Sequence, residues 1–249
     1  MTNRIARIVC TVALFVAVAA TAVAQPAPAS PGASDEWTVI VAPYLMAAGM
    51  SGTVGVKGYD STVDMSASDV LSHLKAGFMG YFGAKKNGWG FGVDTIYSKL
   101  GASATKGAVT IEPTVSTGLY TFLASRRITP VADLVFGARV TSTTTTLAFT
   151  APVVRQVSGS KTWVDPVVGV NVVVPAGAKG KFTMLADIGG FGTASTFAVD
   201  LLPALQVRVA KHAWLAFGYR YIYDDYKDDA GFVYKVTVQG PAFGFVFPF

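Results

Sequence analysis

Apolar and polar residues alternate with a period of two over most of the chain from residue 36 onward. Between residues 133 and 141, Leu134, Phe136 and Val140 alternate with Asp133 and Arg139. Stretches of this kind run for about a dozen residues, are rich in Val, Thr, Phe, Tyr and Gly, and are separated by turn signals. Because a period of two places alternate side chains on opposite faces of a β-strand, the pattern predicts an all-β protein.

The pattern predicts about ten strands, at residues 36–48, 74–86, 89–101, 107–126, 131–147, 161–174, 180–190, 195–210, 213–227 and 231–249. Their length suits transmembrane β-strands, which need about 9 to 11 residues in the bilayer, better than the usual strand of about 5 to 6. Tight turns such as Asn87-Gly88 alternate with connections that include two longer ones, at 49–73 and 148–160. We therefore expect a transmembrane antiparallel up-and-down β-barrel of about ten strands, within a range of about eight to twelve, and a short helix in the first long connection.

A barrel in lipid directs its apolar face outward and its polar face into the lumen. Charges inside a narrow barrel must be paired or hydrated, so we expect a lumen largely filled by ion pairs. The residues predicted to form this network are Lys75, Asp94, Glu112, Asp133, Arg139, Asp165, Asp187, Asp200, Arg208 and Arg220. A catalytic role for the carboxylates is the alternative, and a secreted β-sandwich with its apolar face inward is the alternative fold.

Composition supports a membrane environment, since hydrophobic residues make up 51% of the chain and charged residues only 14%, against about 25% in soluble domains. The apolar stretch at residues 8–24 follows Arg4 and Arg7 and ends in small residues, which predicts a secretory signal peptide at 1–24. A retained anchor helix is the alternative. A Pro/Ala/Ser-rich segment at 25–35 is predicted to be a disordered linker that precedes the barrel at 36–249.

The charge and cysteine content narrow the function further. The formal net charge is +5, and basic residues form no run with interleaved aromatics, so no nucleic-acid partner is expected. The one cysteine, Cys10, lies inside the predicted signal, so the exported chain cannot depend on disulfides. We expect a monomer without a cofactor.

A possible catalytic pair is Asp69 and His73, which are four residues apart and would share a helical face beside several serines. Such a group could activate a hydroxyl for acyl transfer, which would make the protein an outer-membrane acyl hydrolase or acyltransferase. No G-x-S-x-G elbow is present, and Ser66 or Ser68 would cap a short helix there. A helix at the barrel mouth is therefore the favoured interpretation, with no enzymatic activity.

Four acidic residues crowd one turn near the end of the chain: Asp224, Asp225, Asp228 and Asp229. Calcium or magnesium would bind such oxygen ligands, and a divalent ion could bridge the turn to lipopolysaccharide phosphates. Lys227 lies among them, however, and their spacing fits no standard cation loop. A solvated acidic hairpin without metal is the favoured interpretation.

Three segments resemble small outer-membrane β-barrel proteins of Gram-negative bacteria, in an uncharacterised proteobacterial family. They are APYLMAAGMSGTVGVKG (42–58), AGFMGYFGAKKNGWGFGVDTIYSKL (76–100) and FGYRYIYDDYKDDAGFVYKVTVQGPAFGFVFPF (217–249). The alternating Phe243, Phe245, Phe247 and Phe249 are similar to the assembly signal of this class. The resemblance implies residence in the outer membrane, contact with its lipid and lipopolysaccharide, and recognition by periplasmic chaperones and the barrel-assembly machinery.

The last strand carries an irregularity. Tyr234, Val236 and Val238 occupy even positions whereas the terminal phenylalanines occupy odd ones, which predicts a β-bulge at Gly240-Pro241. Beyond it, the strand is expected to pair with the first strand near Trp37. The fold leaves three roles open: a structural role, a surface interaction through residues 49–73 and 148–160, and a narrow channel.

Overall fold

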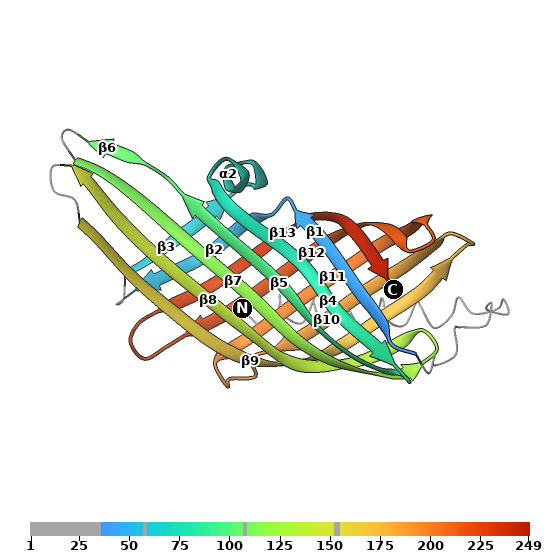
Figure 1. Ribbon diagram of the computed structural model, residues 1–249. Coiled ribbons are helices and arrows are strands. Elements are labelled where there is room, and N and C mark those ends of the chain that lie inside the picture. The colour runs from blue at the N-terminus through green and yellow to red at the C-terminus, as the bar shows by residue number, and fades with distance from the viewer. Residues whose placement is uncertain (1–35, 57–58, 107–108, 152–154) are drawn as a thin grey trace. The chain divides into compact units, whose positions relative to one another are not determined.

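The computed structural model describes residues 36–56, 59–106, 109–151 and 155–249 (Figure 1). The predicted signal peptide and linker lie outside these residues. The elements are β1 (Thr38–Met46), β2 (Gly49–Val56), β3 (Tyr59–Met65), α2 (Ala67–Ser72), β4 (Leu74–Lys86), β5 (Trp89–Gly101), β6 (Ala104–Lys106), β7 (Val109–Thr129), β8 (Ala132–Ala151), β9 (Arg155–Ala176), β10 (Gly180–Gly189), β11 (Ser195–Ala210), β12 (Ala213–Lys227) and β13 (Val233–Pro248). Among the described residues, no helix is long and apolar enough to cross a membrane.

Ten strands form a closed antiparallel barrel in the order β1-β4-β5-β7-β8-β9-β10-β11-β12-β13, and β13 pairs back onto β1. The closing pair runs from Ile40 opposite Pro248 to Met46 opposite Ala242. Beyond it, the backbone amide and carbonyl of Phe249 bond to those of Val39 at 2.8 and 3.0 Å. The predicted barrel, its short helix and the pairing of the last strand beside Trp37 are confirmed.

The outer face of the barrel is apolar, as lipid requires. Large side chains that point outward and remain exposed include Leu45, Phe78, Phe82, Phe91, Phe122, Phe136, Val164, Ile188, Leu205, Phe217, Phe243 and Phe245. The residues between them are buried polar or small groups, such as Asp133 and Arg139 on β8. Because every wall strand is paired on both sides over its membrane-spanning part, apart from a short seam at β4, backbone groups meet the bilayer with their hydrogen bonds made. The β-sandwich alternative is wrong, because the apolar face points out.

Tight turns gather at the end of the barrel where β1 begins and β13 ends (Figure 1). The predicted β4–β5 hairpin is present, and Asn87 and Gly88 have φ of 51° and 76°, as a type I′ turn requires. Short turns beside the ends of the chain face the periplasm in outer-membrane barrels. We assign this end to the periplasm and the opposite end to the cell surface.

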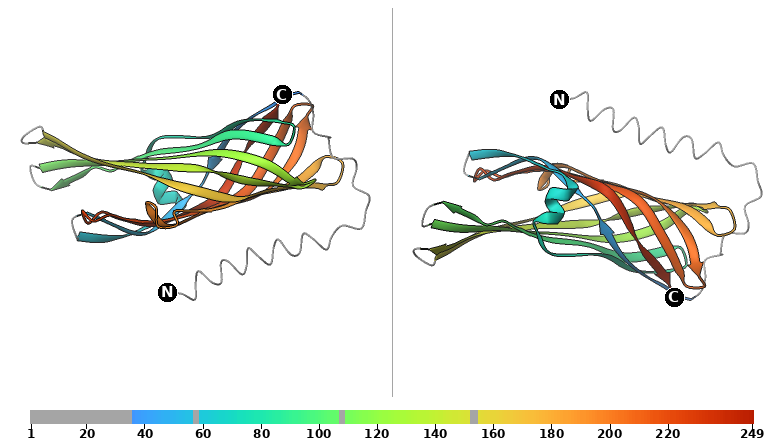
Figure 2. Two further views of the ribbon diagram at one scale, coloured as in Figure 1. Left: turned by 90° about the horizontal axis from the view of Figure 1, so that it is seen from below. Right: turned by 90° about the horizontal axis from the view of Figure 1, so that it is seen from above.

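At the surface end, strands extend well past the closed barrel. β7, β8 and β9 have 21, 20 and 22 residues, about twice the length needed to cross a bilayer. β2 pairs with β13 and β3 pairs only with β2, and Figure 2 shows this second sheet apart from the β6–β9 extension. The predicted long connections are therefore largely regular structure: 49–73 contains β2, β3 and α2, and the described part of 148–160 continues β8 and β9.

The barrel wall has one seam, between β1 and the surface half of β4. β1 and β4 pair only from Thr38 opposite Lys85 to Pro43 opposite Gly80. Residues 74–79 of β4 then pair with β5 alone. The strand that follows β1, β2, pairs with β13 on one side and with β3 on the other, so it does not pair with β4. The helix α2 connects β3 to this half-paired part of β4.

The predicted β-bulge at Gly240-Pro241 is wrong. β13 pairs with β12 without a register shift from Trp214 opposite Val246 to Lys227 opposite Val233. Gly240 instead allows the backbone of β13 to approach residue 47 closely, because a Cβ at position 240 would lie 2.0 Å from the Ala47 carbonyl oxygen. Tyr234, Val236 and Val238 therefore face the lumen, and the change of apolar face along β13 reflects a change in what the lumen contains.

Candidate functional site

The middle of the lumen is filled by a layer of ion pairs centred on Arg220 of β12, which is 1% exposed. Its guanidinium donates to Asp200 through Nε at 3.0 Å and through Nη2. Nη2 also donates to Asp94, and Nη1 donates to the Tyr44 hydroxyl. The Tyr44 hydroxyl in turn donates to Asp94 at 2.9 Å. These partners come from β1, β5 and β11, so one arginine links strands from around the barrel.

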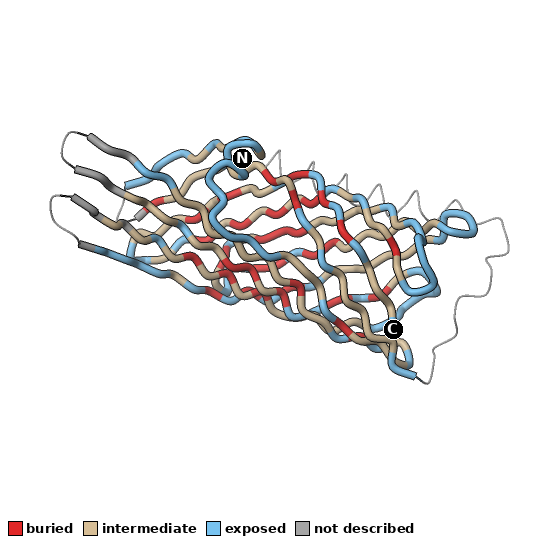
Figure 3. Tube along the Cα trace, turned by 45° about the horizontal axis from the view of Figure 1, so that its top comes forward, coloured by how far each residue is buried: buried red, intermediate tan, exposed pale blue. Residues whose placement is uncertain are grey.

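Arg139 of β8 completes this layer. Its Nη2 donates to Asp187 at 2.7 Å and to Asp200 at 3.2 Å, and its Nε donates to the Thr121 hydroxyl at 3.2 Å. Asp200 thus lies between the two arginines. Two buried guanidiniums and three buried carboxylates cross the lumen here, and Figure 3 shows buried residues gathered on the strands at this level.

A second polar cluster contains Asp165, Ser195, Asp224 and Thr141, all buried. The Ser195 hydroxyl lies 2.6 Å from Asp165 Oδ2 and 2.7 Å from Asp224 Oδ1, and its backbone amide donates to Asp165 at 2.7 Å. A serine hydroxyl can donate only one hydrogen bond. The second short contact therefore needs a proton that Ser195 cannot supply.

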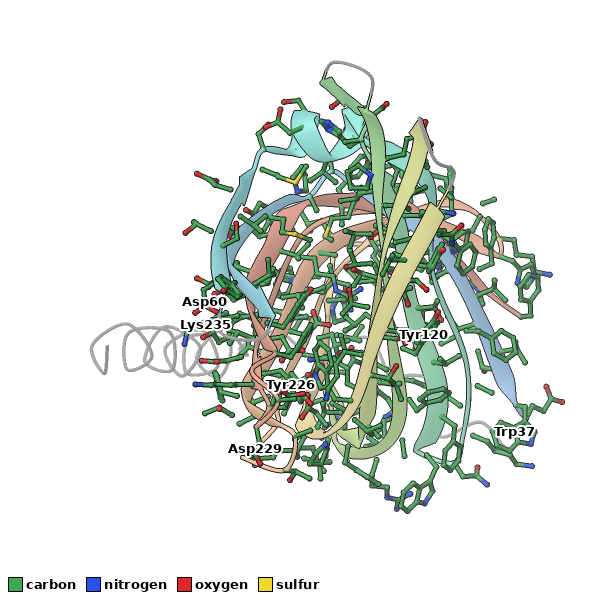
Figure 4. The ribbon with its side chains drawn as sticks, turned by 90° about the vertical axis from the view of Figure 1, so that its left-hand side faces the viewer. Trp37, Asp60, Tyr120, Tyr226, Asp229 and Lys235 are labelled. Carbon is green, nitrogen blue, oxygen red and sulfur yellow. The ribbon has the colours of Figure 1, made fainter. Side chains whose placement is uncertain are left out.

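A packed cluster that we call the aromatic plug lies at the surface end of the lumen, beside β9, β12 and β13, and contains Trp163, Tyr226, Phe232, Tyr234 and Val236. Trp163 stacks on Tyr226 with ring centroids 4.3 Å apart and meets Tyr234 at 5.3 Å. Figure 4, which looks onto the surface end, labels Tyr226. The Lys161–Asp228 ion pair connects β9 to the β12–β13 turn beside the plug, and this hydrogen bond from Lys161 lowers the pKa of Asp228.

Below the ion-pair layer, toward the periplasm, lies a cavity of about 320 Å³. Its wall is mainly aliphatic, from residues such as Ile40, Leu123, Val135, Val173, Leu185 and Leu202. Polar groups enter it from Lys85, Asn171, Lys181, Thr183 and Gln206, and Tyr44 and Asp94 reach it from the ion-pair layer.

The structure brings five of the ten predicted network residues together in the ion-pair layer and places Asp165 in the second cluster. Asp133 is buried nearer the periplasm, where it accepts from Lys85 at 2.7 Å and lies 3.5 Å from Arg127. Lys75, Glu112 and Arg208 lie elsewhere. Lys75 is exposed on the half-paired part of β4, Glu112 is partly exposed on the β7 extension, and Arg208 is exposed beside Trp214.

The Asp69 and His73 pair is exposed and is not arranged as a catalytic dyad. The Asp69 carboxylate accepts from the Ser66 backbone and hydroxyl in a capping box at the start of α2, and these bonds lower the pKa of Asp69. His73 Nδ1 contacts the Asp69 backbone carbonyl at 2.8 Å and the Ser72 hydroxyl at 3.1 Å. Ser66 is thus the N-cap that the sequence predicts.

The four acidic residues at 224–229 do not converge. Asp224 faces the lumen beside Ser195, Asp225 pairs with Lys235, Asp228 pairs with Lys161, and Asp229 is exposed. Within the described ranges, no group of three or more His, Cys, Asp or Glu side chains has the arrangement of a metal site.

The terminal phenylalanines lie on the lipid-facing side of β13, and Phe243, Phe245 and Phe249 are 48%, 47% and 68% exposed. Trp37 and Trp89 are exposed near the periplasmic rim, as expected for an aromatic girdle. Trp214, by contrast, faces inward and is 9% exposed. Lys181 and Arg208 lie over its ring, 4.3 and 4.7 Å from the centroid.

Sequence reasoning missed the neutral members of the lumen: Tyr44, Thr121, Ser195 and the aromatic plug. Strand parity did not place either Tyr44 or Thr121, because β1 carries no predicted network residue and Thr121 lies nine positions from Glu112, on the opposite face of β7. The plug carried the opposite signal, because its apolar residues occupy the inward set where polar residues were expected.

No protein family model matches the chain, and no curated protein matches it. Solved structures with a similar fold include the attachment invasion locus protein Ail of Yersinia pestis, in complex with the heparin analogue sucrose octasulfate. It is 14% identical, with a TM-score of 0.40 over 87% of this chain and 100% of that chain. Another is the translocator domain of the autotransporter NalP from Neisseria meningitidis, 10% identical, with a TM-score of 0.39 over 100% of this chain and 98% of that chain.

A third similar structure is a FadL homologue of Pseudomonas aeruginosa, 8% identical, with a TM-score of 0.33 over 86% of this chain and 90% of that chain. The closed barrel with its lipid-facing belt is that of a Gram-negative outer-membrane protein. The narrower proteobacterial family stays a prediction.

Proposed function

We propose that this outer-membrane β-barrel is a closed surface protein, and that its β7–β9 extension contacts the saccharide of lipopolysaccharide. The observation that carries the proposal is an abrupt change along one face. On the outward side of these strands, the aligned Tyr120, Val140 and Val164 end the apolar belt. Above them, the outward positions carry hydroxyl groups.

We call these positions the hydroxyl rows: Ser142 with Thr162, then Ser116 with Thr144 and Ser160, then Thr114 with Thr146 and Ser158. Ser142 and Thr162 lie 2.9 Å apart across the strands. On β7–β9 this array of hydroxyls is uncharged and begins immediately above the lipid belt, and Lys99 of β5 stands opposite Ser116 at its edge. We place the lipopolysaccharide sugars at this level. Hydroxyls both donate and accept hydrogen bonds, as sugars do.

A closed lumen supports a surface role over that of a porin. Barrels of this strand number have interiors that side chains can fill. Here the ion-pair layer crosses the lumen, because its ion pairs join side chains of β5, β8, β10, β11 and β12. A non-enzymatic role is supported by the exposed Asp69 carboxylate, which is bound to Ser66 rather than to His73.

The test replaces the middle hydroxyl row by Ser116→Ala, Thr144→Val and Ser160→Ala in one variant. The control, Thr117→Val with Thr143→Val, changes the inward face of the same strands. Binding of isolated lipopolysaccharide core oligosaccharide to the barrel in nanodiscs is measured by calorimetry. We expect binding about tenfold weaker in the outward variant, since each lost hydrogen bond contributes about 0.5–1.5 kcal/mol, and unchanged binding in the control. Equal affinity of the outward variant and the wild type would refute the saccharide contact.

For biogenesis, we propose export by the signal at 1–24, a linker at 25–35 and a monomeric barrel at 36–249. We also propose that periplasmic chaperones and the barrel-assembly machinery recognise the terminal strand. Support comes from the outward alternation of Phe243, Phe245 and Phe247 on the strand that closes the barrel.

A further inference from the structure

The cavity on the periplasmic side of the ion-pair layer is lined by charged side chains that are not part of that layer. Lys85, which lines the cavity, pairs with Asp133, and Asp133 also pairs with Arg127. Asp94, at the inner end, is bound to Arg220 and Tyr44. The cavity is therefore bordered by acids that already have cationic partners.

Lys181 of β10 lines this cavity. Among the ion pairs of the described residues, none includes Lys181 or the neighbouring Arg208, and both cations lie over the Trp214 ring. A cation held at an aliphatic wall and balanced by no carboxylate is suited to attract an anion, because the low dielectric of such a site strengthens the interaction.

A second polar group points to the same place. Gln206 lines the cavity, and its Nε2 donates to the Thr183 hydroxyl at 3.2 Å. Its Oε1 is buried without a hydrogen-bond partner among the described residues. Buried polar atoms are normally satisfied. A 180° turn of the Gln206 amide would let Oε1 accept from the Thr183 hydroxyl and would bring Nε2 to the unpartnered position, where it could donate to an anionic head group.

We propose that the cavity binds a small amphipathic anion, with its acidic head against Lys181 and its apolar body against the aliphatic wall. The size, about 320 Å³, is at the small end of the range of about 300–1,000 Å³ for small-molecule sites. The mainly aliphatic lining with a few convergent polar groups matches the usual composition of such sites. This activity is independent of the saccharide contact, since the cavity and the hydroxyl rows lie at opposite ends of the barrel.

The experiment uses three probes that share one alkyl chain and differ in charge: decanoate, decanol and decyltrimethylammonium. The barrel in nanodiscs is titrated with each, and methyl signals of Val173, Leu185 and Leu202 are followed by NMR. Empty nanodiscs correct for partition into lipid. We expect saturable shifts with decanoate, weaker binding of decanol and no saturable shift with the cation.

Two variants and one control locate the site. Lys181→Gln should weaken decanoate on the order of tenfold, as expected for loss of a charge-assisted hydrogen bond, and leave decanol unchanged. Ala216→Leu adds bulk to the cavity wall and should abolish both. Lys179→Gln, in the turn just before β10 and outside the cavity lining, should behave as wild type.

The backbone amide spectrum of each variant must match the wild type, which separates loss of binding from loss of fold. The proposal fails if the cavity methyls do not respond to decanoate, or if decanoate and the cation bind equally. It also fails if Lys179→Gln weakens decanoate as much as Lys181→Gln does.

Discussion

At the scale of single residues, the lumen depends on side chains that satisfy several strands at once. Arg220 contacts Tyr44, Asp94 and Asp200, and the alternation of β12 alone places it in the lumen. An ion pair taken out of water contributes to stability only when its remaining hydrogen bonds are made. Here the tyrosine and the shared Asp200 supply them.

Arg220→Met should therefore lower the free energy of unfolding by about 3–5 kcal/mol, because Asp94 loses its cation and Asp200 retains only Arg139. Urea unfolding in phospholipid vesicles, followed by tryptophan fluorescence, measures the loss. Lys211→Met, in the exposed β11–β12 turn, is the control and should stay within about 0.5 kcal/mol. Adding Asp94→Asn to Arg220→Met should restore part of the loss. A loss below about 1 kcal/mol for Arg220→Met would mean that the layer is not the structural centre of the lumen.

At the scale of elements, strand boundaries were predictable where local chemistry marks them. β4, β5, β11 and β12 coincide with the predicted ranges because hairpin signals bound them. The predicted ranges 107–126 and 131–147 already contain most of the extensions of β7 and β8, whereas β2, β3, β6 and the outer end of β9 were not predicted as strands. At the outer end of β9, residues 156–160 are mostly polar on both faces, so the alternation of apolar and polar residues that identifies a strand is absent there.

The seam at β4 gives an element-scale prediction. Residues 74–79 pair with β5 alone, so their amides that point away from β5 should exchange with solvent deuterium much faster than amides of β8 at 134–140, which pair on both sides. Hydrogen exchange with NMR detection in nanodiscs resolves the two sets. Amides of β5 that bond to β4 serve as the internal control and should exchange slowly. Equal protection of both sets would show that another group covers the seam.

At the scale of the whole barrel, closure of the lumen rests on the Arg–Asp layer, whose ion pairs join β5, β8, β10, β11 and β12. The aromatic plug lies at the surface end beside β9, β12 and β13, on one side of the barrel. A conducting path would have to displace the charged layer.

We therefore expect no steady conductance from the wild-type protein in planar lipid bilayers. A variant with Trp163→Ala and Tyr226→Ala should also remain closed, because the ion-pair layer is still present below the plug. Single-channel recording measures both, with a porin preparation as the positive control. A stable open level in the wild type would overturn the closed lumen, and one in the double variant alone would show that the charged layer is no barrier to ions.

The sequence by itself determined the wall of this protein. Which face of each strand meets lipid follows from a period of two, which is a local property of the chain, and hairpin residues set most of the strand ends. The tertiary structure decided the contents of the lumen, since the partners of Arg220 lie 20, 126 and 176 positions away. Only the register of ten strands around a closed barrel brings them to one level. The same closure turned Tyr234 and Val236 inward, because a strand paired without a bulge cannot change its face, whatever its apolar pattern suggests.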